Sequence, residues 1–194
     1  NNTFSFIFGG GAILDDVISY YIVAQDNVSP LPNIGAFPVG GAAGFTSNPP
    51  ACVTPPAIPS SYKVILDISG IKHVGIGKDY TTLTAAAADL NNRYMAGPVT
   101  FILDDNAYPN ETFPILFNDR AGNSPVNTLT IRPNTGATPV IIGPALMNGI
   151  IVMNGIDYVT FDGSNNGTGS KDLTIENTSS SGNAHAFGIT NHGG

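Results

Sequence analysis

Six short segments in the second half of the chain share one pattern, and this repetition constrains the fold more than any other feature. Each is rich in β-favouring apolar residues and ends in Gly, Asn, Asp or Pro. Such strands cannot each bury a face alone, so they need like strands stacked above and below them. The pattern predicts a parallel β-solenoid with strands at 129–133, 140–143, 150–154, 159–163, 173–177 and 187–191.

Ahead of these strands, residues 81–92 have the periodicity of an amphipathic helix. Asp79, Thr81 or Thr82 can cap its start, and Asn91-Asn92 can end it. We expect the helix to cover the open first rung of the solenoid, after a strand at 62–67 and before an apolar strand at 99–103. The apolar face comprises Leu83, Ala86, Ala87, Leu90 and Tyr94.

Three regions follow from these patterns. Residues 1–29 read as an incomplete antiparallel β segment, with Phe4, Phe6 and Phe8 on one face at period two. Residues 30–61 contain so many Pro and Gly residues that an extended linker is expected. Residues 62–194 form the parallel β-helix, which we expect to be cut short at its C-terminal end.

Charge is scarce in this chain. Only 11% of residues are charged, the net charge is −7, and Gly (23) and Pro (15) are abundant, whereas soluble domains average about 25% charged residues. A surface of small neutral polar residues is typical of an extracellular protein. The seven basic residues are scattered, which excludes a nucleic-acid interface. No apolar run approaches the roughly 20 residues that membrane insertion needs.

Cys52 is the single cysteine, so an intrachain disulfide and a thiolate metal cluster are excluded. The simplest interpretation is an unpaired small residue in a Pro-rich stretch. An intermolecular disulfide is the alternative.

Several of these segments carry a family resemblance. Residues 79–91, Thr130-Ile-Arg-Pro133, Asp157-Tyr-Val-Thr-Phe-Asp-Gly163 and Asp172-Leu-Thr-Ile-Glu-Asn177 resemble secreted or cell-surface proteins of the Bacteroidetes type. The resemblance implies a right-handed parallel β-helix of the pectin-lyase-like fold. Ser19-Tyr-Tyr-Ile-Val-Ala-Gln-Asp-Asn27 is similar to the end of an immunoglobulin-like or fibronectin type III-like module. For function the resemblance implies little, because one fold hosts many activities.

Enzymatic hydrolysis of a polysaccharide would need two placed carboxylates. Asp104-Asp105 is the one adjacent acidic pair in the predicted solenoid, and consecutive strand residues point to opposite faces. The alternative is a turn in which both carboxylates cap backbone N–H groups. Hydrolases of the resembled fold also supply an Arg-x-Lys, which this chain lacks. We therefore predict no catalytic residue and no enzymatic activity.

The best candidate metal site is a structural calcium site. Asp157, Asp162, Asp172 and Glu176 lie on neighbouring segments, and calcium takes six to eight oxygen ligands. The alternative is a Gly- and Asn-rich turn between rungs that uses these residues for positive φ. No other cofactor is predicted.

The sequence favours an extracellular structural or adhesive protein that self-associates head to tail by β-strand addition. The predicted assembly interface comprises Phe4, Phe6, Phe8, Phe187 and Ile189. Its partner is a second copy or a neighbouring domain of a longer chain.

Two alternatives stay open. One is a module that binds or cleaves glycans, with Tyr80, Tyr94, Tyr108 and Tyr158 as candidate aromatic platforms. The other is a passive spacer in a large surface protein.

Overall fold

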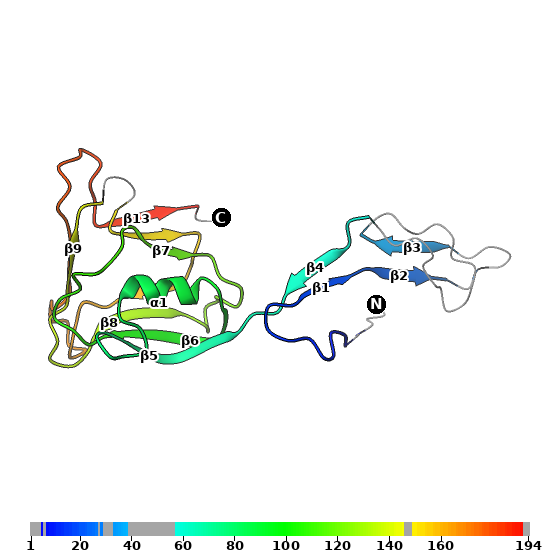
Figure 1. The fold of residues 1–194 in the computed structure, drawn as a ribbon, viewed down its shortest axis with the longest axis horizontal. Helices are drawn as coiled ribbons and strands as arrows, with labels where there is room; N and C mark the ends of the chain where they lie inside the picture. The colour runs from blue at the N-terminus through cyan, green and yellow to red at the C-terminus, as the bar shows by residue number, and fades with distance from the viewer. Residues whose placement is uncertain are drawn as a thin grey trace. The chain divides into compact units, whose positions relative to one another are not determined.

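The second half of the chain folds as a parallel β-solenoid of about four turns, as the repeated segments predict (Figure 1). The computed structural model describes residues 5, 7–26, 28, 33–38, 57–145 and 149–191. It divides the chain into two units, residues 1–65 (unit 1) and residues 66–194 (unit 2).

The strands of unit 2 stack in three columns, each of them parallel. The largest column holds β5 (Asp67–Val74), β6 (Tyr94–Leu103), β8 (Leu129–Pro133) and β11 (Val159–Phe161). The second holds β7 (Ile115–Asn118), β10 (Ile151–Asn154) and β13 (Phe187–Thr190), and the third holds β9 (Val140–Gly143) and β12 (Thr174–Asn177). All six predicted segments are therefore strands of the solenoid.

The register explains why the sequence repeats. Val99 lies beside Leu129, and Leu129 lies beside Val159, a step of 30 residues each time (99 to 129 to 159). In the second column Ile115, Ile151 and Phe187 align with a step of 36 (115 to 151 to 187). Alternate residues of each strand point into the solenoid, so like residues stack on like residues and exclude water from a continuous core.

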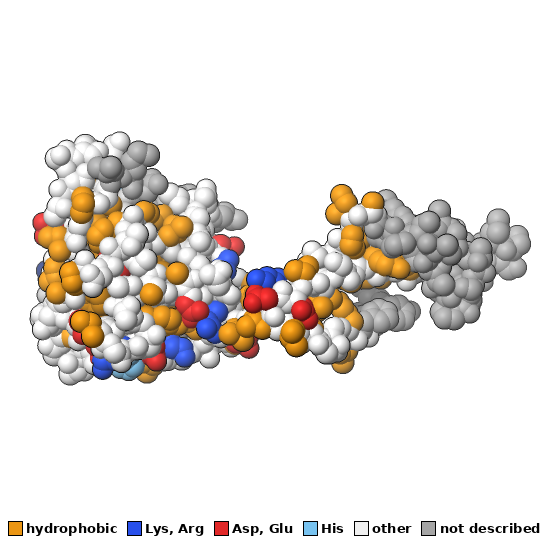
Figure 2. Space-filling model, in the orientation of Figure 1, with side chains coloured by type: hydrophobic (Ala, Val, Ile, Leu, Met, Phe, Trp, Pro, Cys, Tyr) orange, Lys and Arg blue, Asp and Glu red, His pale blue; other side chains and the backbone are white. Residues whose placement is uncertain are grey.

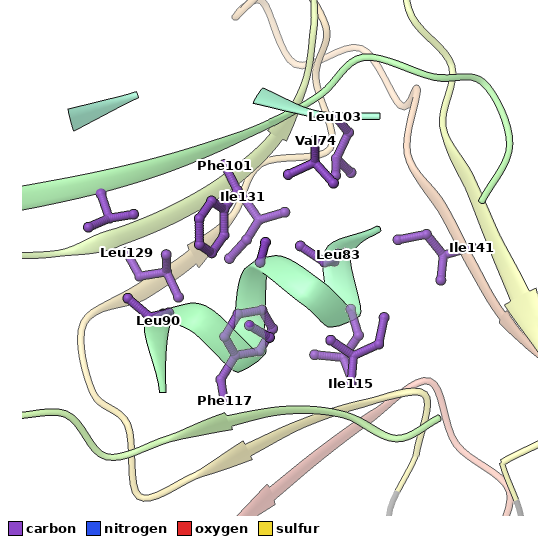
Figure 3. Packing of buried hydrophobic residues seen from close by; sticks show 14 of the residues in the cluster. Val74, Leu83, Leu90, Phe101, Leu103, Ile115, Phe117, Leu129, Ile131 and Ile141 are labelled. Carbon is purple, nitrogen blue, oxygen red and sulfur yellow. The ribbon is translucent and has the colours of Figure 1, made fainter. Parts of the chain in front are cut away.

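The single helix of the described residues, α1 (Leu83–Leu90), belongs to the first turn. It contacts β5, β6 and β7, and its buried residues are four of the five predicted ones, Leu83, Ala86, Ala87 and Leu90. In Figure 3, Leu83 and Leu90 reach into the cluster that includes Phe101, Phe117 and Ile131.

Thr82 caps the start of α1, since its hydroxyl accepts a hydrogen bond from Ala85 N at 3.0 Å. Asn91 is the C-terminal cap. Tyr94 departs from the prediction because the helix ends before it, and Tyr94 starts β6 instead.

The strands in the described part of unit 1 all pair antiparallel. Its strands are β1 (Val17–Tyr20), β2 (Ile22–Gln25), β3 (Ile34–Phe37) and β4 (Ser60–Lys63); β1 pairs with β4 and β2 pairs with β3.

Two expectations about strands were wrong. The strand expected at 62–67 is divided, because residues 60–63 pair with β1 in unit 1 while β5 begins at Asp67. The stretch expected to be an extended linker contains β3, which pairs with β2 along one edge. Phe4 and Phe6 lie outside the described residues, as does Cys52.

The two units differ in how they bury apolar side chains. Every residue of the buried hydrophobic cluster belongs to unit 2, from Ile68 to Ile156. Among the unit 1 residues whose side-chain exposure the structure describes, none is fully buried. No helix in the described part of the chain has the length and apolar character to cross a membrane.

Candidate functional site

Polar side chains meet where β5, β6 and β8 end. Asp104, directly after β6, accepts hydrogen bonds from Asn134 Nδ2 at 2.6 Å and contacts His73 Nδ1 at 2.7 Å. The Asp104 side chain is only 7% exposed, and Lys78 Nζ lies 3.9 Å from it. Because a buried carboxylate needs such partners, Asp104 ties three successive rungs together. His73 lies in β5, one residue before its end.

The side chain of Asp105 contacts different residues from those that Asp104 contacts. Its carboxylate accepts a hydrogen bond from Ile76 N at 2.8 Å, and it lies against Gly75, where any Cβ would contact it. The two adjacent carboxylates thus hold different parts of the fold, since Asp104 joins the ends of β5 and β8 and Asp105 holds the turn that follows β5. The alternative to a hydrolytic pair was a turn in which both carboxylates cap backbone N–H groups. The observed geometry is closer to that turn. Only Asp105 binds a backbone N–H, however, whereas Asp104 binds side chains.

Two of the four candidate aromatic platforms use their hydroxyl groups in hydrogen bonds within the protein. Tyr108 is buried and donates a hydrogen bond to Val74 O at 2.7 Å; burial raises the pKa of its phenol. The Tyr80 hydroxyl donates a hydrogen bond to Asp89 at 2.5 Å. The pKa of Tyr80 is raised mainly by burial and, to a smaller extent, by this hydrogen bond. Tyr94 and Tyr158 are the exposed ones of the four, whereas Tyr80 is partly buried.

The predicted calcium ligands are dispersed over separate local contacts. Asp162 accepts from Ser164 N at 2.9 Å. Asp172 accepts from Ser170 Oγ at 2.5 Å and Asn165 N at 2.8 Å, and these hydrogen bonds lower the pKa of its carboxyl. Glu176 is exposed on β12 and Asp157 follows β10. Within the described ranges, no three His, Cys, Asp or Glu side chains are grouped to hold a metal ion.

A ladder of asparagines runs along the ends of β7, β10 and β13. Asn154 Nδ2 donates to Asn118 Oδ1 at 2.8 Å, and Asn191 Nδ2 donates to Asn154 Oδ1 at 2.6 Å. Asn91, the cap of α1, starts the series, since its Oδ1 accepts from Asn118 N at 2.9 Å. Sequence reasoning missed this ladder, although the spacing of 36 between positions 118 and 154 was a usable signal.

A groove of about 470 Å³ opens beside the asparagine ladder. Asp119 and Asp157 contribute carboxylates to it, and Arg120 contributes a guanidinium. Arg120 is held in place because its Nε donates to Asp119 O at 2.6 Å and its Nη1 donates to Asn91 O. We call this feature the ladder groove; it is lined by Asn118, Asp119, Arg120, Asn154, Gly155, Asp157 and Asn191.

The described members of the predicted assembly interface are all exposed to some degree. Phe8 packs its ring against Tyr20, with centroids 5.2 Å apart, and beside an apolar groove in unit 1. Phe187 packs its ring against Phe161 at 5.0 Å, so it also belongs to the last described rung of the core. Ile189 is the most exposed of the three. Whether they form an interface stays a prediction.

No protein-family model matches the chain, and neither the curated proteins nor the solved structures show a significant match to it. The functional argument therefore rests on the geometry of the described residues.

Proposed function

We propose that this chain is an extracellular structural protein that self-associates through unit 1. One observation carries the proposal: none of the unit 1 residues whose side-chain exposure the structure describes is fully buried. Two-stranded antiparallel pairs are marginally stable on their own and need further strands or a packed face. A second copy of the chain would supply both.

The exposed residues of unit 1 fit such a contact. Ile22 and Phe37 are cross-strand partners on β2 and β3, and they are 47% and 60% exposed. Val17 on β1 is 63% exposed. Because these side chains are already about half buried, completing their burial would stabilise an assembly by roughly 1–2 kcal/mol each. Figure 2 shows hydrophobic side chains at the surface of unit 1.

The surface of unit 2 supports a structural role. In Figure 2 it is mostly white, which marks neutral polar side chains and backbone, with few charged groups. Low charge reduces the repulsion between copies that would otherwise oppose close association.

A head-to-tail arrangement is the specific form of the proposal. A strand of unit 1 in one copy would pair with β13 of the next copy, where Phe187 and Ile189 are exposed. Such a contact joins two different surfaces, so it generates a filament unless the rotation closes a ring. The proposal includes a secreted or cell-surface location, as in Bacteroidetes-type proteins with a pectin-lyase-like helix after an immunoglobulin-like module.

Light scattering and electron microscopy of the full chain test the proposal. The wild type should form oligomers or filaments, and Ile22→Lys should weaken the association at least tenfold by placing a charge in an apolar contact. The matched control is Ile76→Lys, since Ile76 is 82% exposed in a turn of the solenoid. A wild-type chain that stays monomeric at its highest soluble concentration would refute self-association. Equal effects of both variants would refute the role of unit 1.

A further inference from the structure

One residue that lines the ladder groove, Gly155, has no side chain. Its φ is 78°, and a Cβ there would meet Asn191 O and the Asp119 side chain at 3.3 Å. A side chain at this position would therefore fill the groove. The hydrogen bonds of Asn154 to Asn118 and Asn191 hold the amides around it in fixed orientations, which lowers the entropy cost of binding a ligand.

The walls of the groove present polar atoms without partners. Among the described residues, no hydrogen bond or ion pair engages the carboxylates of Asp119 and Asp157, and both side chains are exposed. Arg120 uses Nε and Nη1 for backbone carbonyls, so Nη2 retains open donors. Planar acceptors and donors that converge on one concave surface give a ligand a defined orientation.

The charge of the groove selects among ligands. Two carboxylates and one guanidinium leave a formal charge of −1, and the chain as a whole carries −7. A polyanion such as a polyuronate would be repelled. A neutral ligand with many hydroxyl groups matches the groove, because a carboxylate or guanidinium can bind two neighbouring hydroxyls at once.

Tyr158 follows the groove residue Asp157 and has a left-handed backbone, with φ at 52°. This conformation is unfavourable for a bulky side chain and often accompanies a functional constraint. Asn191 lines the groove with φ at 50°, a conformation that asparagine adopts readily. Tyr158 is itself outside the lining of the groove, but it is exposed, and an exposed ring can stack on the apolar face of a sugar.

From these features we infer that the ladder groove binds a neutral oligosaccharide. Asp119 and Asp157 accept hydrogen bonds from its hydroxyls, and Arg120 donates to its ring or hydroxyl oxygens. Binding requires no covalent step and no metal ion. The inference does not depend on self-association, because every lining residue belongs to unit 2.

Isothermal titration calorimetry on the full chain tests the inference. The probes are four neutral hexasaccharides (cello-, xylo-, manno- and chitohexaose) and hexagalacturonate as the anionic counterpart. At least one neutral probe should bind, and hexagalacturonate should not. Asp157→Asn and Asp119→Asn should each weaken binding at least tenfold, because a hydrogen bond to a charged group is lost. Glu176→Gln is the matched control, since Glu176 is an exposed carboxylate on β12 outside the groove.

Melting temperatures show whether a variant that loses binding is still folded like the wild type. All three variants replace exposed side chains with near-isosteric ones, so their melting temperatures should equal that of the wild type. Absence of binding by every neutral probe overturns the inference, and so does tighter binding of hexagalacturonate. Equal affinities of the Asp157→Asn, Asp119→Asn and Glu176→Gln variants would also overturn it.

Discussion

Two glycines with similar backbone angles have very different surroundings. Gly122 has φ at 88° and Gly136 has φ at 79°. A Cβ on Gly136 would meet nothing within 4 Å, whereas a Cβ on Gly122 would collide with the carbonyl of Met95. Both positions favour glycine for its backbone freedom, but only Gly122 is also required by packing.

Alanine substitution should separate these two causes. Gly136→Ala should lower the free energy of unfolding by about 1 kcal/mol, the cost of a left-handed residue with a side chain. Gly122→Ala should lower it by about 3 kcal/mol, because overpacking against the backbone is added. Urea denaturation measures both values. Equal losses would contradict the packing argument at Gly122.

Tyr108 should make stability depend on alkaline pH. Burial raises the pKa of its phenol above the ordinary value of 10.0, so the folded state holds the proton more tightly than the unfolded chain. This contribution is fully present below pH 10.0 and is lost as the pH rises through the higher folded-state pKa.

Tyr108→Phe tests this dependence. The decrease in the free energy of unfolding between about pH 9 and about pH 11 should be smaller in this variant than in the wild type. The exposed Tyr158 provides the control, and Tyr158→Phe should retain the wild-type decrease. Denaturation at the two pH values measures each. If Tyr108→Phe retained the full decrease, another group would be responsible.

At the scale of elements, α1 depends on a residue far from it in the chain. Glu111 accepts hydrogen bonds from Leu83 N at 2.6 Å and Thr84 N at 2.7 Å, and Thr84 Oγ1 donates to it at 2.5 Å. The first turn of a helix has free N–H groups and a partial positive charge, so a carboxylate there is stabilising. Glu111 therefore joins the loop before β7 to the helix that covers the first turn.

Glu111→Gln should lower the free energy of unfolding by about 1–2 kcal/mol, because the charge at the helix N-terminus is removed. Chemical denaturation measures the loss. Glu176→Gln removes an exposed carboxylate elsewhere and should change stability by less than about 0.5 kcal/mol. A Glu111→Gln variant as stable as this control would show that the cap contributes nothing.

Prediction from sequence succeeded where an element has a clear apolar period. The segments at 129–133 and 140–143 show alternating burial in the structure because their alternate residues face the core. β5 was missed, since Lys72 and His73 interrupt its apolar pattern, and His73 contacts the carboxylate of Asp104. β3 was missed because prolines surround it and Gly35-Ala36 has little β propensity.

For the whole molecule, the division into two units has a thermodynamic consequence. The buried hydrophobic cluster lies wholly within residues 66–194, so that fragment retains the burial that drives folding. No residue of 1–65 whose side-chain exposure is described is fully buried, so that fragment lacks a comparable driving force.

The two fragments should therefore behave differently. Residues 66–194 expressed alone should unfold cooperatively, whereas residues 1–65 alone should show no cooperative transition as a monomer. Circular dichroism during thermal unfolding measures both, with the full chain as the reference. A cooperative transition of monomeric 1–65 would show that unit 1 needs no partner.

The sequence by itself determined the parallel solenoid and the helix of the first turn, because apolar periodicity is a local property that sets which face of each element is buried. Only the tertiary structure decided which distant residues meet. Asp104 with His73 and Asn134, Glu111 with α1, and the asparagines beside Asp119 and Asp157 come together because turn lengths set the register between rungs. That register depends on the packing of the whole stack, so no local pattern specifies it.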